Sequence, residues 1–543
     1  MQTPSPASKV GTLPQSLQQL ISRLEQETPT TPVQMRKILV ESDIPEKDLM
    51  PWADFDHPAK DSYGRKMIYK GEQFEVMAMS WQPGDMSTIH DHGYTQWGAV
   101  KTYGPAEHAT FRVEDEILST TSRKQFNAGD VVGVSHTFVH QMGNPTDEPF
   151  LSLHVYGDLE AIDNVTGDAR LFDLRTDEIQ RINGGVFFDL REDEIARREP
   201  GPKGDFPTRL RHMVELAKRM RTAGADENRI QEVLGETFGP DQNERLLEFI
   251  KSIIDENNHT DNSLQWGILN QELRAAAALQ ADLQSEDEAS SSDAFKHYAE
   301  LYDAVICQPC MDHFMASYLK FLVKELDLNL KEHRMISIGC GTGLVEEFIQ
   351  TELGMPREQM YGIDLSASMV EVARKRLKAD VGNVLELDPA LGTWSLVYSG
   401  LNVYQYLPPE DFAQAVQKTA TIIEPGGYFI GDFITPDHIR WYPNFLTGAD
   451  EKVISLRTPR LVEQQGRVFQ ESEITNISFL RGNMEVTYSG KHMRFLAPMN
   501  RIRQTFEAAF GGNVKLYDAV TCQEIPEWAD TCESTRYVVV AKK

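Results

Sequence analysis

The sequence predicts a multidomain chain with an all-β N-terminal unit, a helical spacer and an α/β C-terminal unit. Three observations support this prediction. Residues 66–156 read as short strands separated by turn signals every 8–12 residues or so, which is typical of a β-sandwich or barrel. From about residue 205 apolar residues recur at helical spacing. Strands and helices then alternate after residue 293, which is the pattern of a parallel sheet covered by helices.

The N-terminal segment is rich in Pro, Thr, Ser and Gln, so we expect a loose tail with one short helix at Leu17–Gln26. An acidic, serine-rich stretch at Ser285–Asp293 reads as a linker. The predicted segments are the tail at 1–40, the β unit at 41–195, the helical spacer with its acidic linker at 196–292, and the α/β unit at 293–543.

The bulk composition excludes several classes of function. The 543 residues carry a formal net charge of −28, which disfavours nucleic acids and anionic membranes as partners because both select basic surfaces. The N-terminus has no apolar core of signal-peptide length, and no stretch approaches the ~20 apolar residues of a membrane span. Five cysteines are too few for a disulfide framework in a chain of this length, so we expect the protein to reside in the reducing cytoplasm.

Two histidines flank one aspartate in the stretch IHDH. In a strand, His90 and His92 would point to the same face about 7 Å apart, with Asp91 facing the other way. Two ligands do not hold a metal ion, so a third is needed from a neighbouring strand.

The spacing of these residues resembles that of the cupin barrel. Gly84 lies six positions before His90, and Gly129 opens a second motif that contains His136 and His140. In that fold the first motif contributes two histidines and the second a third. The usual glutamate ligand of the first motif is missing, because Gln96 and Trp97 lie there. The resemblance therefore implies a ligand set of three neutral imidazoles, namely His90, His92 and His140. His136 is the rival for the third position, but its offset in the second motif fits less well.

A narrower resemblance is to cysteine dioxygenase, the mononuclear iron thiol dioxygenase branch of the cupins. Tyr63-Gly64-Arg65 precedes the barrel strands and Ser152-Leu153-His154-Val155-Tyr156 closes them. The resemblance implies that the three histidines hold Fe²⁺, that Arg65 pairs with the substrate carboxylate, and that Ser152, His154 and Tyr156 form a relay beside the metal. A planar guanidinium matches a carboxylate with two parallel hydrogen bonds.

One departure from some family members concerns the active-site tyrosine, which they cross-link to a cysteine. The first cysteine here is Cys307, outside the predicted barrel, so that cross-link cannot form within it. Trp97 is predicted near the corresponding position, and its bulk leaves open a thiol other than cysteine.

A glycine-rich turn follows a buried strand in MISIGCGTGL. The GxGxG spacing of Gly339, Gly341 and Gly343 differs from the dinucleotide fingerprint, whose third glycine would fall at Leu344. It resembles the first motif of class I S-adenosylmethionine-dependent methyltransferases, which have a Rossmann-like fold. By this resemblance Asp364, at the end of the next strand, accepts both ribose hydroxyls, Leu365 packs beside the adenine, and Asp388 is a candidate for the adenine edge.

The methyl acceptor is less specified by the sequence. Residues 468–495 read as β-hairpins that would cap the acceptor site, and Tyr298 and Tyr302 would close over the cofactor or pack in the core. The STRYVVVAKK stretch reads as a last, antiparallel strand. We assign no base among the residues expected in the acceptor groove, which are Asn402, Tyr404, Asp432, His438 and Tyr442.

Together these patterns predict a bifunctional cytoplasmic enzyme. Its front half would add dioxygen to a small thiol, most simply cysteine to cysteine sulfinate, and its rear half would methylate a small molecule with S-adenosylmethionine. Two alternatives stay open. The barrel could be a metal-bound but non-catalytic sensor that regulates the methyltransferase, or a zinc or nickel isomerase, since imidazole ligands accept several metals.

Overall fold

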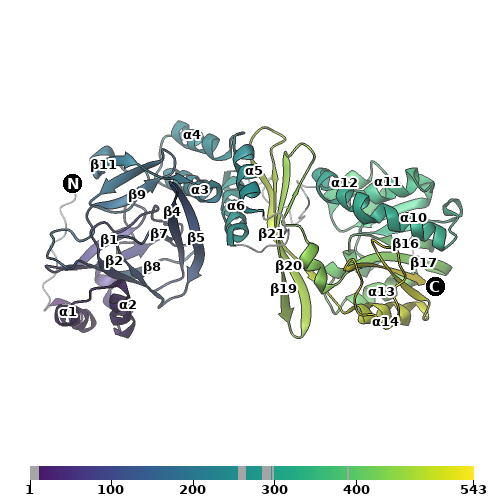
Figure 1. Ribbon diagram of the computed structural model, residues 1–543, viewed down its shortest axis with the longest axis horizontal. Coiled ribbons are helices and arrows are strands. Elements are labelled where there is room, and N and C mark those ends of the chain that lie inside the picture. Colours follow the sequence, from purple (N-terminus) through teal and green to yellow (C-terminus); the bar gives the residue numbers. More distant parts are fainter. Residues whose placement is uncertain (1–11, 255–263, 284–294, 296–298, 388–390) are drawn as a thin grey trace. The chain divides into compact units, whose positions relative to one another are not determined.

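The computed structural model describes residues 12–254, 264–283, 295, 299–387 and 391–543. The chain divides into two compact units, Met1–Phe249 and Ile250–Lys543. The first unit is rich in β-strands and the second is an α/β unit, as the sequence predicts (Figure 1). Among the described residues, no helix has both the length and the apolar character that crossing a bilayer requires.

The first unit contains three sheets. The five-stranded sheet is ordered β1 (Gly64–Lys70), β2 (Phe74–Trp81), β8 (Phe150–Gly157), β3 (Trp97–Thr102) and β6 (Val131–Val134). The four-stranded sheet is ordered β12 (Lys203–Gly204), β5 (Ile117–Phe126), β4 (Ala106–Glu114) and β7 (His140–Gly143). The three-stranded sheet is ordered β11 (Ile195–Pro200), β10 (Glu178–Ile182) and β9 (Ala169–Asp173). Only the short β12–β5 pair is parallel among these described strands.

Strand β8 positions the functional side chains by its two-residue period. Leu151, Leu153 and Val155 lie in an apolar cluster on one face of the sheet. The alternating residues Ser152 and Tyr156 are buried on the opposite face, where Tyr156 belongs to a second cluster with residues of both large sheets. Because successive side chains in a strand point to opposite faces, β8 contributes apolar side chains to the core on one face and Ser152 and Tyr156 to the other face.

The short helix expected at Leu17–Gln26 is present within a helix at Gln15–Glu27, but the segment around it is not a loose tail, because a second helix follows and both are packed. Helices α1 (Gln15–Glu27) and α2 (Pro32–Glu41) bury apolar residues such as Leu17, Ile21 and Leu39 in the cluster that includes β8. The composition of the segment suggested disorder, but its apolar residues recur at helical spacing and find a sheet face to cover. Thr31 caps α2 by accepting a hydrogen bond from the backbone N–H of Gln34.

The expected helical spacer is divided between the two units. Helix α3 packs in the first unit, where the Nη1 atom of Arg219 lies 2.9 Å from the Oδ1 atom of Asp85. Helix α6 packs in the second unit, where the Nε2 atom of Gln280 donates to the carbonyl of Met484 at 2.8 Å. The helices of this region are α3 (Phe206–Thr222), α4 (Glu227–Phe238), α5 (Gln242–Ile253) and α6 (Leu264–Leu283). The predicted linker Ser285–Asp293 lies outside the described residues.

The second unit is built on a seven-stranded sheet. Its order is β15 (Lys378–Val381), β14 (Met360–Asp364), β13 (Met335–Ile338), β16 (Trp394–Ser399), β17 (Ile423–Ile434), β23 (Arg536–Lys542) and β22 (Val514–Asp518). Strand β23 is antiparallel to both of its neighbours, as the sequence predicts for the last strand. The longer helices around this sheet are α10 (Ala316–Glu325), α11 (Leu344–Thr351), α12 (Ala367–Ala373), α13 (Phe412–Thr421) and α14 (Met499–Phe510).

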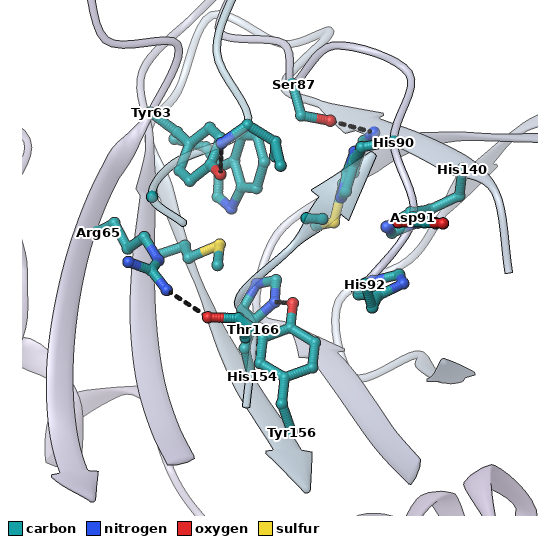
Figure 2. A pocket seen from close by; sticks show the side chains of 16 residues that line it. Tyr63, Arg65, Ser87, His90, Asp91, His92, His140, His154, Tyr156 and Thr166 are labelled. Atoms are coloured by element: carbon teal, nitrogen blue, oxygen red, sulfur yellow. Dashed lines mark hydrogen bonds between the residues drawn. The ribbon is translucent and has the colours of Figure 1, made fainter. Parts of the chain in front are cut away.

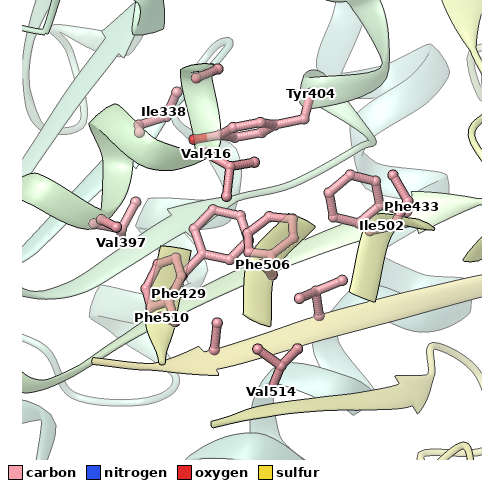
Figure 3. Packing of buried hydrophobic residues seen from close by; sticks show 14 of the residues in the cluster. Ile338, Val397, Tyr404, Val416, Phe429, Phe433, Ile502, Phe506, Phe510 and Val514 are labelled. Atoms are coloured by element: carbon pink, nitrogen blue, oxygen red, sulfur yellow. The ribbon is translucent and has the colours of Figure 1, made fainter. Parts of the chain in front are cut away.

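An aromatic core lies between this sheet and its helices (Figure 3). The rings of Phe429 on β17 and Phe506 on α14 have centroids 4.8 Å apart. Tyr404 belongs to this core, and its hydroxyl lies 2.5 Å from the Oγ1 atom of Thr419. The placement of Tyr404 in the acceptor groove is therefore wrong, because its aromatic ring is packed between helix and sheet.

A second sheet of this unit carries the predicted hairpins. Its four antiparallel strands are β18 (Phe445–Thr447), β19 (Val453–Gln464), β20 (Arg467–Ser478) and β21 (Glu485–Phe495). Before the seven-stranded sheet, the chain runs through α8 (Ala299–Tyr302) and α9 (Gln308–Cys310), with π-helical turns at Asp303–Cys307 and Met311–Met315.

Candidate functional site

Three buried histidines meet in the first unit (Figure 2). His90, His92 and His140 each offer a ring nitrogen, and these three atoms lie within 4.8 Å of one another. All three residues are buried, with at most 7% of their surface exposed. His136, the rival third ligand, is exposed and lies outside this group. This is an arrangement that can hold one metal ion.

The segment that carries the first pair is not the regular strand that its sequence suggests. His90 forms isolated β-bridges with His140 and Leu171, while His92 lies in an irregular stretch that follows. Asp91 pairs with Arg170, whose Nε atom lies 2.5 Å from the Oδ2 atom of Asp91. The bridge between His90 and His140 is what brings the two motifs together.

The Nδ1 atom of each histidine has a hydrogen-bond partner. The partner is the carbonyl of Thr88 for His90, at 2.9 Å, and the carbonyl of Ser135 for His92, at 3.2 Å. A carbonyl only accepts, so the hydrogen of these rings is on Nδ1 and the Nε2 lone pair is free. The buried Nε2 atom of His92 has no hydrogen-bond partner among the described residues. A metal ion would satisfy it, and such outer partners are typical of metal-bound histidines.

Burial keeps these rings neutral. It lowers the pKa of His90 to about 4, and it places the pKa of His92 and of His140 well below the usual histidine value, helped by the neighbouring imidazoles. Neutral imidazoles retain the lone pairs that bind metals across the physiological pH range.

His108 is a functional residue that the sequence reasoning missed. Its Nε2 atom lies 2.9 Å from the Nδ1 atom of His140, and its ring stacks on Phe126 with centroids 4.6 Å apart. It lies on β4, which pairs with the strand that begins at His140. The sequence around His108 reads as an ordinary strand and did not mark it as a site residue. Its contact with His140 depends on the pairing of two strands that are distant in sequence.

Replacing His108 with phenylalanine is expected to weaken metal binding about 10- to 100-fold, because His140 loses the partner that orients its ring. Competition with a chelator of known affinity measures this change. His108→Gln is the matched variant, since its amide oxygen can still accept a hydrogen bond, and it should retain most of the affinity. Equal affinities for His108→Phe and the parent protein would contradict this role.

Ser152, His154 and Tyr156 form a hydrogen-bonded chain. The Oγ atom of Ser152 lies 2.7 Å from the Nε2 atom of His154, whose Nδ1 atom lies 2.7 Å from the hydroxyl of Tyr156. Burial lowers the pKa of His154 to about 3 and raises that of Tyr156, so both side chains stay neutral.

Trp81 gives this chain a direction. Its indole N–H donates to the Oγ atom of Ser152 at 2.8 Å, and an indole cannot accept. Ser152 is fully buried, and among the described residues its own hydroxyl hydrogen has an acceptor only if Ser152 donates to His154, whose Nδ1–H then donates to Tyr156. The hydroxyl hydrogen of Tyr156 is left to point into the cavity.

One cavity contains most of the predicted residues. It is lined by Arg65, His154 and Tyr156 together with the three histidines (Figure 2). Ser152 is not among the lining residues, and its hydroxyl is hydrogen-bonded to His154. The Nη2 atom of Arg65 donates to the Oγ1 atom of Thr166 at 3.1 Å.

Trp97 does not line this cavity, contrary to the expectation that its bulk would shape the substrate site. Its ring lies in the apolar cluster of α1 and α2, and its Nε1 atom donates to the carbonyl of Asp158 at 3.2 Å. The strand period turns Trp97 to the face of β3 opposite the site.

In the second unit the glycine-rich turn adopts a conformation that L side chains rarely take. Gly339, Gly341 and Gly343 have φ values of 71°, 54° and 78°. A Cβ atom at Gly339 would meet the side chain of Val403 at 2.5 Å, whereas one at Gly341 would meet nothing within 4 Å. The loop therefore leaves open space at Gly341, which is room for a ligand beside bare backbone.

Asp364 lies at the end of β14 beside this loop. Its Oδ2 atom accepts from the backbone N–H of Gly341 at 2.8 Å, and its Oδ1 atom accepts from that of Ser366 at 2.9 Å. Leu365, which follows Asp364, is 74% exposed. Asp388 lies outside the described residues.

A second cavity contains part of the expected acceptor groove. Asn402, Tyr442 and Tyr302 line it, whereas Asp432 lies behind it, paired with Arg536. His438 is not among its lining residues, and its Nδ1 atom lies 2.8 Å from the Oγ1 atom of Thr535. Tyr298 lies outside the described residues. The cavity also contains three arginines that the sequence reasoning missed, Arg457, Arg494 and Arg536.

Comparison with known families agrees with both resemblances. Residues 4–161 match the family model of cysteine dioxygenase type I, and residues 336–427 match that of a methyltransferase domain. The first match includes Arg65 and the three histidines, and the second includes the glycine-rich turn and Asp364.

Individual relatives are distant. An uncharacterized protein of Rickettsia prowazekii (strain Madrid E) is 27% identical over 139 residues, which cover 23% of this chain and 54% of that protein. The chain thus spans about half the length of this curated relative.

Solved structures similar to the chain include an S-adenosylmethionine-dependent methyltransferase from Clostridium acetobutylicum, at 14% identity, 46% coverage of this chain, 98% of that chain and a TM-score of 0.36. Another is the sugar N-methyltransferase KedS8 from a Streptoalloteichus species, at 14% identity, 48% and 99% coverage and a TM-score of 0.33.

Proposed function

We propose that this chain, which combines a cysteine dioxygenase type I region with a methyltransferase domain, is a bifunctional enzyme. The front unit would use ferrous iron to add dioxygen to a small thiol acid, most simply converting cysteine to cysteine sulfinate. The rear unit would transfer a methyl group from S-adenosylmethionine to a small molecule. The observation that carries the first activity is the convergence of three neutral, buried imidazoles in a cavity that also holds Arg65 and Tyr156.

Iron fits the donor set. Three neutral ligands leave the full 2+ charge of the ion to attract a thiolate, which a glutamate ligand would partly cancel. Bound ferrous iron supplies the redox chemistry by which both atoms of dioxygen are added to a thiol sulfur, so that one thiol and one dioxygen become one sulfinic acid.

The protein's own side chains position the substrate. Arg65 lines the cavity and donates a hydrogen bond to the neutral hydroxyl of Thr166, and its planar guanidinium can also bind a carboxylate. Tyr156, oriented through His154, Ser152 and Trp81, presents a hydroxyl hydrogen to the reacting oxygen atoms.

Arg65→Lys is expected to raise the KM for cysteine about 10- to 100-fold, because an ammonium group cannot make two parallel hydrogen bonds to a carboxylate. Cysteamine, which has the thiol and the amine but no carboxylate, should be oxidised equally well by the parent and the variant. Oxygen uptake measures both. A similar loss with cysteamine would mean that Arg65 supports the fold or the metal rather than the carboxylate.

In the rear unit S-adenosylmethionine, when bound, supplies an electrophilic methyl group. The open space beside the backbone of Gly341 would accommodate the methionine portion of the cofactor. The Gly339–Gly343 turn resembles the first motif of class I methyltransferases, which approaches this portion. Asp364 would accept the ribose hydroxyls and Leu365 would pack against the adenine, with Asp388 as a further candidate at the adenine edge.

The decisive experiment is oxygen uptake by the iron-loaded chain with cysteine and without S-adenosylmethionine. Stoichiometric formation of cysteine sulfinate supports the dioxygenase. Absence of uptake while the metal stays bound would support a non-catalytic sensor instead. Metal analysis of the purified protein separates an iron site from a zinc or nickel one.

A further inference from the structure

The second cavity of the C-terminal unit lies at the carboxyl edge of its parallel sheet. Asn402 follows β16 there, and Arg536 begins the antiparallel β23 at the same edge. Strands β19, β20 and β21 contribute a further part of the wall, with Arg457 and Arg494 among their residues. The same sheet edge carries the glycine-rich turn and Asp364, so a methyl donor held there would be adjacent.

The charge of this cavity is positive. Arg457, Arg494 and Arg536 are only 6%, 8% and 8% exposed, and no described lining residue is an aspartate or a glutamate. Arg536 has the buried carboxylate of Asp432 as its counter-charge.

Arg494 has only neutral partners. Its guanidinium donates to the hydroxyl of Tyr406 at 2.5 Å, to that of Tyr442 at 3.3 Å and to the Oε1 atom of Gln470 at 3.2 Å. Its buried Nε atom has no hydrogen-bond partner, and no carboxylate of the described chain lies within ion-pair distance of it. A buried charge without a counter-charge is costly, so this arrangement favours a bound anion.

The titratable neighbours do not supply that negative charge at neutral pH. Burial alone would raise the pKa of Tyr442, but the positive charges of Arg494 and Arg457 outweigh it and bring this pKa to about 8. Burial and the same arginines lower the pKa of His492 to about 4, and burial raises the pKa of the Cys310 thiol. Tyr442, His492 and Cys310 are therefore mainly uncharged at pH 7.

Asn402 adds an independent observation. It is 4% exposed, its Oδ1 atom accepts from Arg536 at 3.2 Å, and its Nδ2 atom is buried without a partner among the described residues. A ligand oxygen in the cavity would satisfy this donor.

We propose that this cavity is the methyl-acceptor site and that its ligand is a small acid whose carboxylate or sulfinate group is held by Arg494, with Asn402 donating to a further oxygen. The proposal rests on the methyltransferase function proposed above. It also gives the fusion a chemical reason, since oxidation of a thiol acid yields a molecule that carries both kinds of oxyanion. In the transfer itself the acceptor's lone pair forms the new bond to the methyl carbon, the electrons of the broken C–S bond return to sulfur to leave S-adenosylhomocysteine, and any proton on the acceptor atom is released.

The test is calorimetric titration of the full chain saturated with S-adenosylhomocysteine, in an Arg65→Met background that disables the front site. Four probes separate the anionic groups: L-cysteine sulfinate, which has both, L-alanine, which has the carboxylate alone, 2-aminoethanesulfinate, which has the sulfinate alone, and L-alaninamide, which has neither. We expect cysteine sulfinate to bind and alaninamide not to bind. At least one of the two single-anion probes, L-alanine or 2-aminoethanesulfinate, should also bind, with a lower affinity than cysteine sulfinate.

Arg494→Met should weaken the binding of cysteine sulfinate at least about 30-fold, and Arg494→Lys should recover part of it, because charge is restored without the planar fork. Arg460→Met is the matched control, since Arg460 is an exposed residue of β19 paired with Glu471, and it should bind the probes as the parent does. Unchanged affinity for S-adenosylhomocysteine in each variant shows that the unit is folded.

The two proposals fail in different ways. If the parent protein itself did not bind S-adenosylhomocysteine, the methyltransferase function would be overturned. Intact S-adenosylhomocysteine binding together with equal affinity for alaninamide and cysteine sulfinate, or with no effect of Arg494→Met, would overturn the acid-binding site alone.

Discussion

Replacing His140 with alanine is expected to empty the metal site of the front unit and to abolish thiol-dependent oxygen uptake. The proposed site has three protein ligands, and the described residues around it offer no fourth His, Cys, Asp or Glu within the same group. Since loss of an outer partner alone typically costs 10- to 100-fold in affinity or activity, loss of a ligand should reduce oxygen uptake by roughly 100-fold or more. Metal content by elemental analysis and oxygen uptake with cysteine measure the two effects.

His136→Ala is the control for this experiment. His136 lies in the same second motif but is exposed and outside the metal group, so the variant should bind metal and consume oxygen as the parent protein does. Affinity for S-adenosylhomocysteine should be unchanged in both variants, because the glycine-rich turn belongs to the other compact unit. Full metal content in His140→Ala, or its loss in His136→Ala, would rule out the ligand set proposed here.

Replacing Asp364 with asparagine is expected to weaken S-adenosylhomocysteine binding by roughly 10- to 100-fold. The Asp364 carboxylate accepts hydrogen bonds from the backbone N–H groups of Gly341 and Ser366. The ribose hydroxyls would donate to the same carboxylate. Hydrogen bonds to a charged group contribute about 1.5–3 kcal/mol, and each 1.4 kcal/mol is a tenfold change in affinity. Calorimetric titration of the purified chain gives the change directly.

Asp380→Asn is the matched control for Asp364→Asn. Asp380 lies on the neighbouring strand β15 and is exposed, with partners in Tyr361 and Arg374. Its variant should bind S-adenosylhomocysteine as the parent does. If Asp364→Asn retained the parent affinity, the ribose would have to be held elsewhere, and the role of Asp364 would be confined to the loop.

The elements that the sequence located well are those whose signals are local. The turn at Gly339–Gly343 needs positive φ values, and the sequence places glycines at each of those positions. The strand and helix alternation after residue 335 and the antiparallel last strand are also as predicted, because each short segment carries its own apolar pattern.

The errors share a different origin. Composition suggested a loose tail before residue 40, but its apolar residues pack on a sheet that forms from later parts of the chain. Trp97 and Tyr404 were expected at sites and are in cores instead, since the face to which a side chain points depends on strand pairing and helix packing.

The candidate sites show the same division. The sequence by itself identified the site residues that lie close together along the chain, such as His90 with His92 and the three glycines of the turn. The resemblance of the sequence to the cupin motifs already favoured His140 over His136 as the third histidine. Only the tertiary structure decided that His108 and Trp81 are hydrogen-bonded to site residues, and that three arginines from separate strands meet in one cavity. The physical reason is that local patterns follow from backbone geometry within a few residues, whereas convergence of distant side chains follows from strand register, which no short stretch of sequence contains.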